Sequence, residues 1–414
     1  MKIAYFVWEY PPLMVGGLGT YASQVAPRLA KFGNEITVFT LNDGTLKTSE
    51  QMGDIKVNRP NIIKAKEMLN LVVNENLHNW GDYLSFFNKI FSYNYLSAAK
   101  FLNETLKNEK YDLVVIHDWL SAIAGLIIKQ DTDLPIVFHM HSTEQQRVGG
   151  GSPTIRSFER EMAEQADSII TVSYAMKEHL IELGYPEEKI NVVWNGCDTD
   201  KYKLENVNWD LVDELKNKYK VKENEKVVFF VGRLTWIKGA ESLVRGFPLV
   251  LKEYPNTKLI VLGKGEQQQS IEELVKRNGM EDKVVVRSEF VSEDERIAHY
   301  ALCDIAVFPS TAEPFGIVSL EGMCLKKPVI VGASGISGFK EQVIPDGEEQ
   351  TGVHVDGRSY EDIAWGIKEV LKDETKAKEM GERGRKRAEE IFNLDRVASE
   401  TLSVYNRAVD NKSK

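Results

Sequence analysis

Short apolar runs alternate with stretches of helical periodicity along most of this 414-residue chain. A short apolar run bounded by polar turns is typical of a buried strand, whereas apolar residues three or four positions apart mark one face of a helix. In the first half, runs that predict strands lie at 3–8, 35–40, 112–117, 134–139, 167–172 and 190–194. The stripe Tyr21, Val25 and Leu29 predicts a helix after the first strand, with Gly33 as its expected end. Strands interleaved with helices predict a parallel sheet.

The second half repeats this alternation after a polar, turn-rich linker at about 195–224. Strands are predicted at 226–231, 257–262, 283–287, 304–308 and 328–331, and helices at 239–253, 267–277, 293–302 and 316–325. Residues 359–409 have a helical pattern with a break near Phe392, and the less regular residues 43–100 are interpreted as an insertion. We therefore expect an α/β protein of two doubly wound, Rossmann-like domains facing across a cleft, with ligands at the carboxyl ends of the strands.

Composition agrees with about two domains of a soluble globular protein, since 43% of the residues are hydrophobic and 28% are charged. The formal net charge of -10 argues against a nucleic-acid partner or an anionic membrane surface, so a phosphate ligand must be held by a few local cations. No apolar stretch approaches the ~20 residues of a membrane span. The N-terminal apolar run is too short for a signal peptide. Cys197, Cys303 and Cys324 are interpreted as free buried thiols, which favours a cytoplasmic protein.

Two carboxylates eight positions apart, Glu313 and Glu321, follow the predicted strand at 304–308. A helix that opens at Gly316 would place the first carboxylate in a loop at the strand end and the second about one turn into the helix. The N-terminus of a helix attracts an anion such as phosphate, while carboxylates suit the hydroxyl groups of a sugar or a ribose. The segment therefore predicts a nucleotide-sugar site and, with it, glycosyl transfer.

Two further motifs follow predicted strands. Arg233 and Lys238 come after the strand at 226–231, where they would stabilise the charge of a departing diphosphate. The alternative is a pair of solvated loop charges. Gly16-Gly-Leu-Gly19 follows the first strand and opens a helix, so backbone N–H groups could approach a phosphate or a sugar. A plain tight turn is the alternative, and the G-x-G-x-x-G pattern of nicotinamide dinucleotide binding is not present.

Histidines end two neighbouring strands of the first half, at His117 and at His139 with His141. The rings of His139 and His141 are expected on opposite sides of their strand, which argues against a shared metal ion. We assign His139 to packing and His141, which lies further out, to function. Asp118 would either hold the hydroxyl groups of an acceptor or cap the following helix.

Taken together, these motifs resemble those of the retaining glycosyltransferases of the GT-B fold, in particular bacterial and archaeal glycogen (starch) synthases and related family 4 and 5 glycosyltransferases. The resemblance runs through almost the whole chain and is densest at Glu9, His141 and the segments 16–19, 117–119, 195–198, 232–239 and 313–321. It implies an acceptor-side domain at 1–200, a nucleotide-sugar domain at 201–392, and a last helix at 393–414 that returns to the first domain.

The same resemblance implies a role for each site residue. Arg233 and Lys238 would bind the donor diphosphate, and Glu321 its ribose. Glu313 and His141 would contact the transferred sugar, which makes them, with the two cations, the expected catalytic residues. The rest of the donor site would be formed by Gly16, Gly17, Phe315, Gly316 and Ile317, and the acceptor site by Asp118 and Glu9.

The leading hypothesis is a retaining hexosyltransferase that extends an α-1,4-glucan from ADP- or UDP-glucose. Its partners would be the nucleotide-sugar donor and the glucan acceptor, and no cofactor is expected because the two cations replace a metal. Asp-Thr-Asp at 131–133 and at 198–200 is accordingly interpreted as two polar turns. The sequence carries no signal for an oligomeric state. The alternatives are a relative with another acceptor (a small sugar, a sugar phosphate or a lipid-linked glycan), a nucleotide-sugar epimerase, and a catalytically silent binding protein.

Overall fold

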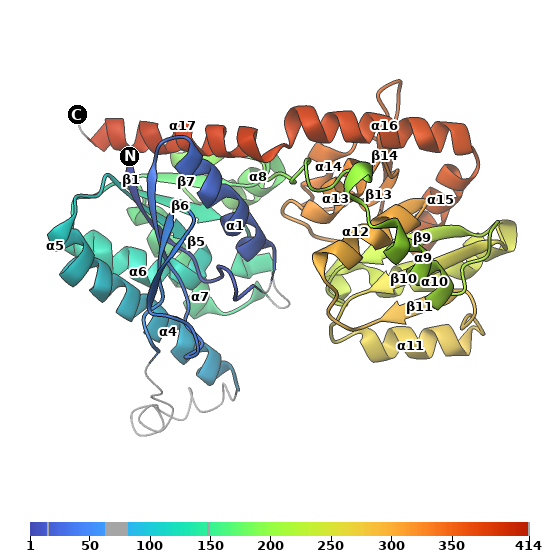
Figure 1. The fold of residues 1–414 in the computed structure, drawn as a ribbon, viewed down its shortest axis with the longest axis horizontal. Helices are drawn as coiled ribbons and strands as arrows, with labels where there is room; N and C mark the ends of the chain where they lie inside the picture. The colour runs from blue at the N-terminus through green and yellow to red at the C-terminus, as the bar shows by residue number, and fades with distance from the viewer. Residues whose placement is uncertain (15, 63–81, 147–149, 413–414) are drawn as a thin grey trace. The chain divides into compact units, whose positions relative to one another are not determined.

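The structure is a computed structural model that describes residues 1–14, 16–62, 82–146 and 150–412. The chain divides into two compact units. The first unit comprises Met1–Val172, Lys177–Val193 and Asp395–Lys414, and the second comprises Ser173–Met176 and Trp194–Leu394. Each unit is a largely parallel sheet with helices packed against it (Figure 1).

The first unit is built on an eight-stranded sheet in the order β3-β4-β2-β1-β5-β6-β7-β8. Its strands are β1 (Lys2–Phe6), β2 (Glu35–Phe39), β3 (Ser49–Met52), β4 (Ile55–Asn58), β5 (Leu113–His117), β6 (Ile136–Met140), β7 (Ser168–Thr171) and β8 (Ile190–Val192). Neighbouring strands pair in parallel except β3 and β4, which form an antiparallel hairpin. The central strands are continuous apolar runs because a parallel sheet is covered on both faces.

The last helix of the chain packs on this first unit. The helices of the unit are α1 (Gly17–Lys31), α4 (Asp82–Lys100), α5 (Leu106–Asn108), α6 (Asp118–Asp131), α7 (Pro153–Gln165) and, apart from their first residues, α8 (Tyr174–Glu182) and α17 (Leu394–Lys412), with a π-helical turn at Phe101–Thr105. In α17, Thr401 Oγ1 lies 3.5 Å from Tyr21 Oη in α1, and Tyr405 Oη lies 2.8 Å from His139 Nε2 in β6. The helix thus supplies one wall of the core beside α1 (Figure 1).

The second unit is built on a six-stranded parallel sheet in the order β11-β10-β9-β12-β13-β14. Its strands are β9 (Lys226–Val231), β10 (Thr257–Leu262), β11 (Val284–Arg287), β12 (Ile305–Phe308), β13 (Val329–Gly332) and β14 (Gly352–Val355). Its helices are α9 (Trp209–Lys218), α10 (Ala240–Glu253), α11 (Gln268–Arg277), α12 (Glu293–Leu302), α13 (Ile317–Cys324), α14 (Phe339–Gln342), α15 (Tyr360–Leu371) and α16 (Glu374–Ile391). Phe230 packs with residues of α10, α11 and α15 on one face, while Phe229 packs on Tyr300 of α12 on the other.

In each sheet the order of strands reverses at one place. The reversal lies between β1 and β5 in the first unit, and between β9 and β12 in the second. Ligands of doubly wound sheets bind at such a switch point, beyond the carboxyl ends of the strands. The predicted residues Glu9, Asp118, Lys238 and Glu313 follow these four strands in that order.

The α/β fold class with two Rossmann-like sheets is confirmed, and the observed strands include every predicted one. Within the segment 43–100, which is interpreted as an insertion, β4 pairs in parallel with β2 and extends the sheet. Residues 63–81 of that segment lie outside the described residues. The helical stretch at 359–409 has a second break, between α15 and α16, where the Asp373 side chain accepts a hydrogen bond from Lys376 N and caps α16.

Candidate functional site

In the second unit, the loop after β9 is fixed against the end of β12. Thr311 N donates a hydrogen bond to Ile237 O at 2.8 Å. Gly239 has a φ of 74°, and a Cβ added to it would lie 2.3 Å from the carbonyl oxygen of Pro309. Both the backbone conformation and this close approach require glycine. The loop that carries Arg233 and Lys238 is therefore held in one position relative to the strand that leads to Glu313.

Lys238 and Glu313 meet at this junction. Lys238 Nζ forms an ion pair and hydrogen bond with Glu313 Oε2, which also accepts from Ser310 Oγ at 3.3 Å. The Glu313 backbone is fixed at both ends, since its N donates to Ile336 O and its carbonyl accepts from Gly338 N, each at 2.8 Å. Glu313 is 8% exposed, and a carboxylate buried to this extent needs a paired cation. The switch point of the second sheet thus holds a fixed carboxylate beside a cation.

Arg233, the other predicted cation, lies five residues before Lys238 in the same loop. Its side chain is exposed and makes no hydrogen bond or ion pair with the residues that the structure describes. An exposed guanidinium with no protein partner can bind an anionic ligand without first breaking an ion pair. Lys238, by contrast, would have to share its charge between the ligand and Glu313.

The start of α13 lies directly after Glu313. Gly316, with a φ of 90°, precedes the helix, and a Cβ added to it would lie 2.1 Å from the Phe339 ring. Phe315 is buried, and Ile317 begins the helix. The first N–H groups of a helix have no acceptor within it, and its N-terminal end carries partial positive charge. The first turn of α13 contains no acidic residue that would compensate this charge.

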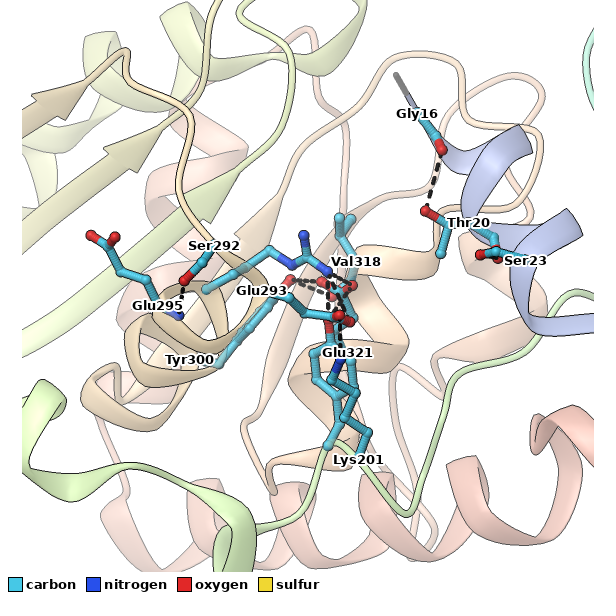
Figure 2. A network of polar contacts seen from close by, with 12 residues as sticks. Gly16, Thr20, Ser23, Lys201, Ser292, Glu293, Glu295, Tyr300, Val318 and Glu321 are labelled. Atoms are coloured by element: carbon cyan, nitrogen blue, oxygen red, sulfur yellow. Dashed lines mark hydrogen bonds and ion pairs between the residues drawn. The ribbon is translucent and has the colours of Figure 1, made fainter. Parts of the chain in front are cut away.

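Glu321 lies about one turn into α13 and accepts hydrogen bonds from three side chains. Tyr202 Oη and Arg296 Nη2 donate to its Oε1 at 2.9 and 3.0 Å, and Tyr300 Oη donates to its Oε2 at 3.0 Å. Figure 2 shows the carboxylate in a network that also includes Glu293. With 5% of its surface exposed, Glu321 is satisfied by the protein itself. A ribose hydroxyl could bind it only by replacing or sharing one of these donors.

The partners of Glu321 were not predicted from the sequence. Tyr202 is 119 positions away along the chain and Arg296 is 25 positions away, so no local motif connects them with Glu321. Burial and, after it, the Glu321 carboxylate raise the pKa of the Tyr202 hydroxyl far above its ordinary value. The hydroxyl therefore stays protonated and remains a donor.

In the first unit, the glycine turn is tied to the loop after β1. Gly16 N donates to Glu9 Oε2 at 2.9 Å, and a Cβ at Gly19 would lie 2.9 Å from the same oxygen. A Cβ at Gly16 or Gly17, by contrast, would meet no described atom within 4 Å. Gly16 also has a φ of -158°, which any residue adopts. Neither packing nor backbone conformation therefore explains these two glycines as a plain tight turn.

Asp118, the first residue of α6, has a backbone conformation that is rare outside glycine. Its φ is 51°, and such strain persists only where the surrounding structure enforces it, often at functional sites. Its Oδ1 accepts a hydrogen bond from His141 N at 2.7 Å. The Asp118 carboxylate thus fixes the backbone of His141, a contact that neither of the two predicted roles for Asp118 includes.

Three histidines form a stack at the ends of β5 and β6. His117 and His139 are direct partners in the register of the two strands, and their ring centroids lie 4.3 Å apart. The ring centroid of His141 lies 5.4 Å from that of His117 and 5.9 Å from that of His139. The expectation that His139 and His141 point to opposite sides of the strand is wrong, because successive side chains alternate and residues i and i+2 share a face.

The stack is hydrogen-bonded and electrically neutral. His117 Nδ1 lies 3.1 Å from His141 Nε2, and His139 Nε2 lies 2.8 Å from Tyr405 Oη. Burial lowers the pKa of the His141 imidazole to about 3. Burial, followed by the neighbouring histidines, also lowers the pKa values of His117 and His139 far below the ordinary value. All three rings are therefore uncharged at neutral pH.

These histidines also form the group of described residues that most resembles a metal site. One ring nitrogen from each lies within 4.8 Å of the others. The rings, however, lie at interplanar angles of only 30°, 19° and 19°. An imidazole binds a metal through a ring nitrogen in the plane of its ring, but His117 Nδ1 and His141 Nε2 are engaged with each other and His139 Nε2 is engaged with Tyr405 Oη. The geometry favours a hydrogen-bonded stack of rings over a shared metal.

Comparison with known families matches one model to each half of the chain. Residues 15–201 match the model described as Glycosyltransferase Family 4, and residues 212–387 match the model described as Glycosyl transferases group 1. An uncharacterized glycosyltransferase of Methanocaldococcus jannaschii is 31% identical over 422 residues, which cover 99% of each chain. A glycogen synthase of Mycobacterium tuberculosis is 27% identical over 417 residues, which cover 98% of this chain and 94% of that protein.

Comparison with solved structures agrees with the family match at the level of the fold. Sucrose-phosphate synthase from Thermosynechococcus elongatus superposes with a TM-score of 0.77 and 22% sequence identity, and the match covers 98% of each chain. This likeness shows the GT-B class of fold that the sequence predicts. Within the described residues, none of the helices is both long and apolar enough to span a membrane.

Proposed function

The chain belongs to the group 1 and family 4 glycosyltransferases of the GT-B fold, and from this membership we propose that it is a retaining glucosyltransferase. The proposed donor is ADP- or UDP-glucose, and the proposed acceptor is the non-reducing end of an α-1,4-glucan. The similarity over nearly the whole chain to a protein named glycogen synthase supports this choice of donor sugar and acceptor.

The ion pair between Lys238 and Glu313 is the observation that carries the proposal. Transfer of a sugar from a nucleotide requires positive charge at the departing diphosphate and negative charge near the sugar carbon, which becomes cationic. Lys238 and Glu313 place these two charges side by side at the switch point of the second sheet. Arg233 and the N-terminal end of α13 add positive charge on the side of the diphosphate.

In the proposed reaction, the bond between the anomeric carbon and the diphosphate oxygen breaks while an acceptor hydroxyl attacks the same face of the sugar. The electron pair of the broken bond stays on the diphosphate, which takes up the proton of the acceptor hydroxyl. Arg233 and Lys238 stabilise the charge on the leaving group, and Glu313 stabilises the cationic sugar. The configuration at the anomeric carbon is retained because the acceptor hydroxyl attacks the same face of the sugar from which the diphosphate departs. These two cations stand in for a metal in the proposal.

The remaining residues have supporting roles in the same proposal. Glu321 would accept a ribose hydroxyl in exchange for one of its present donors. Gly16 and Gly17, which have no side chain, would admit the donor phosphate or sugar to the start of α1. His141 would hold the transferred sugar, and Asp118, which fixes the backbone of His141, would contribute to the acceptor side.

A donor screen followed by an acceptor screen tests the function. A ligand at 100 times its Kd stabilises the folded state by about 2.7 kcal/mol, so thermal unfolding should respond to the correct donor among ADP-, UDP- and GDP-sugars. The best donor is then incubated with glycogen and with small sugars, and the anomeric configuration of the product is read by NMR. Elongated glucan with an α-linkage supports the proposal. An inverted β-linkage, or nucleotide release without any transfer, contradicts it.

The second candidate is a GT-B glycosyltransferase with another acceptor, such as a small sugar, a sugar phosphate or a lipid-linked glycan. It is favoured by the fold neighbour, which is named for the synthesis of sucrose phosphate and has the same architecture. A shared fold does not determine the acceptor. Transfer to a small acceptor but not to glycogen in the same screen would select this candidate.

A further inference from the structure

The hydrogen bond between His117 and His141 has a direction, and that direction decides what His141 can offer a ligand. The Nδ1 of His117 lies 3.1 Å from the Nε2 of His141. We propose that His117 is a positioning residue that donates from Nδ1 to His141 and thereby fixes the proton of His141 on Nδ1. His141 then presents an N–H donor to a hydroxyl oxygen of the transferred sugar. This inference rests on the proposed function for the identity of the ligand, but the direction of the bond can be tested without it.

The surroundings of His117 determine which ring donates. Its other nitrogen, Nε2, is buried and has no hydrogen-bond partner within the described chain. If His141 donated, the proton of His117 would lie on Nε2 as a buried N–H without an acceptor. Orphaned buried N–H groups are rarer and more costly than bare acceptor atoms. The arrangement that avoids such a group places the His117 proton on Nδ1, in the bond to His141.

The hydrogen bond between His117 and His141 has a defined direction only if both rings are neutral, because an imidazolium carries a proton on each nitrogen and cannot accept. Burial lowers the pKa values of His117 and His141, so each ring carries a single proton at neutral pH. A neutral imidazole that accepts at one nitrogen must be protonated at the other. Since His141 accepts at Nε2, its Nδ1 carries the proton.

The N–H group at Nδ1 of His141 is available to a ligand. Its Nδ1 makes no hydrogen bond to the part of the chain that the structure describes. The rest of the residue is fixed, because His141 N donates to Asp118 Oδ1 at 2.7 Å and the ring of Tyr21 lies 4.6 Å from the imidazole. Tyr21 belongs to α1, the helix that begins at Gly17. The free N–H therefore lies in the same unit and beside the same helix as the proposed approach of the donor.

The direct test is the protonation state of each ring nitrogen in the intact protein. The chain has 7 histidines, so histidine labelled with nitrogen-15 gives a spectrum that can be assigned by the loss of signals in His117→Asn and His141→Asn. Two-bond proton–nitrogen correlations distinguish a protonated nitrogen from a bare one. We expect protonated Nδ1 and bare Nε2 in both His117 and His141 at neutral pH. A proton on His141 Nε2 would overturn the inference, whatever reaction the enzyme catalyses.

Activity provides a second test through a matched set of variants. His117→Leu removes the donor, and we expect kcat for transfer to fall about 5- to 10-fold while the Kd for the nucleotide product stays unchanged. His117→Asn replaces the donor with an amide N–H and should recover most of the rate. His139→Gln disturbs the same stack but leaves the bond between His117 and His141, so His141 should keep its proton on Nδ1.

The variants separate positioning from packing. Equal losses of rate in His117→Leu and His117→Asn, with the His141 proton on Nδ1 in both, would mean that His117 only fills space and would refute the inference. If the labelled protein shows the expected protonation but no nucleotide sugar is consumed, the proposed function fails and the direction of the hydrogen bond stands.

Discussion

At the scale of single residues, the buried carboxylate of Glu313 is stabilised by its ion pair with Lys238. Only 8% of the Glu313 surface is exposed, and an unpaired carboxylate buried to this extent would be strongly destabilising. The pair is not an ordinary surface salt bridge, because both residues end loops that are fixed by glycines and backbone hydrogen bonds. In the proposed reaction, Lys238 stabilises the negative charge of the diphosphate and Glu313 stabilises the positive charge of the sugar, and both charges develop only as the bond to the diphosphate breaks. Removing either member should therefore lower turnover, and removing Lys238 should also lower stability because it leaves the buried Glu313 carboxylate unpaired.

We expect Lys238→Ala and Glu313→Ala each to lower kcat about 10²-fold or more. Lys238→Ala removes the positive charge that stabilises the anionic leaving group, and Glu313→Ala removes the negative charge that stabilises the cationic sugar. Steady-state kinetics with the best donor measures the loss, and circular dichroism checks that each variant is folded. Lys252→Ala is the matched control, since this exposed lysine lies at the far end of α10. Near-normal turnover in either site variant would remove that residue from the mechanism.

Gly17 allows a second test at the same scale, because nothing in the described chain requires glycine there. We expect Gly17→Ala to leave the protein as stable as before or slightly more stable, since alanine favours a helix by up to about 1 kcal/mol over glycine. Turnover should nevertheless fall about 10-fold or more, because the methyl group displaces the phosphate or sugar from the start of α1. Thermal unfolding and kinetics on one preparation measure both effects.

Gly33→Ala is the contrasting control for that experiment. Gly33 has a φ of 84°, a conformation that costs alanine about 1–2 kcal/mol, and it follows the far end of α1. We expect it to lower stability and leave turnover unchanged. If Gly17→Ala also lowered stability and left turnover unchanged, Gly17 would have a structural role and no role in binding the donor.

The sequence predicts single residues well where they follow a strand, and poorly where their partners are distant in the chain. Glu313, Lys238 and Asp118 could be found because each lies in the segment that follows a buried apolar strand at the switch point of its sheet. Tyr202 and Arg296 could not be found, because they reach Glu321 only through the folding of a turn and a separate helix onto α13.

At the scale of elements, buried parallel strands were predictable because helices on both faces require continuous apolar runs. The hairpin of β3 and β4 was not predicted, since the β3 sequence Ser49–Met52 is polar and only partly buried. The break between α15 and α16 was also missed, although Asp373 is a residue type that commonly caps a helix. The prediction of opposite directions for His139 and His141 was wrong because residues i and i+2 of a strand share a face, which the spacing of the two residues already implies.

The histidine stack at the ends of β5 and β6 makes stability depend on pH. The pKa of His141 falls from 6.5 to about 3 on folding, because burial disfavours the charged ring. Between these two values the unfolded chain binds a proton that the folded chain does not, so stability falls as the pH falls. Above pH 6.5 both states are neutral and this contribution is constant. Each such histidine contributes a slope of about 1.4 kcal/mol per pH unit within the window.

We therefore expect the free energy of unfolding to decrease between about pH 6 and about pH 4, and His139→Gln to reduce the slope by about 1.4 kcal/mol per pH unit. Glutamine keeps an amide near the position of Nε2 and cannot be protonated in this range. Urea unfolding of both proteins across these pH values measures the difference. Equal slopes would show that His139 is protonated as readily in the folded protein as in the unfolded chain, contrary to its lowered pKa.

At the scale of the whole molecule, the chain carries a formal net charge of -10 and yet is proposed to bind a doubly charged diphosphate. Overall charge therefore cannot attract the donor, and binding must depend on local groups. In the second unit these are Arg233, Lys238 and the start of α13. The residues assigned to the sugar and the acceptor, His141 and Asp118, belong to the first unit. The charged groups for the nucleotide are thus assigned to the second unit, whereas transfer also depends on groups of the first unit.

We therefore expect variants in the two units to differ in their affinity for the nucleotide, although both lose glycosyl transfer. Lys238→Ala should weaken the binding of UDP or ADP about 10-fold or more, since a charge-assisted hydrogen bond contributes about 1.5–3 kcal/mol. His141→Ala should change that affinity less than about twofold, because the nucleotide without its sugar has no proposed contact with His141. Glycosyl transfer should be impaired in both. Isothermal titration with the bare nucleotide and kinetics with the nucleotide sugar measure the two quantities, and a large loss of nucleotide affinity in His141→Ala would show that His141 itself contacts the nucleotide.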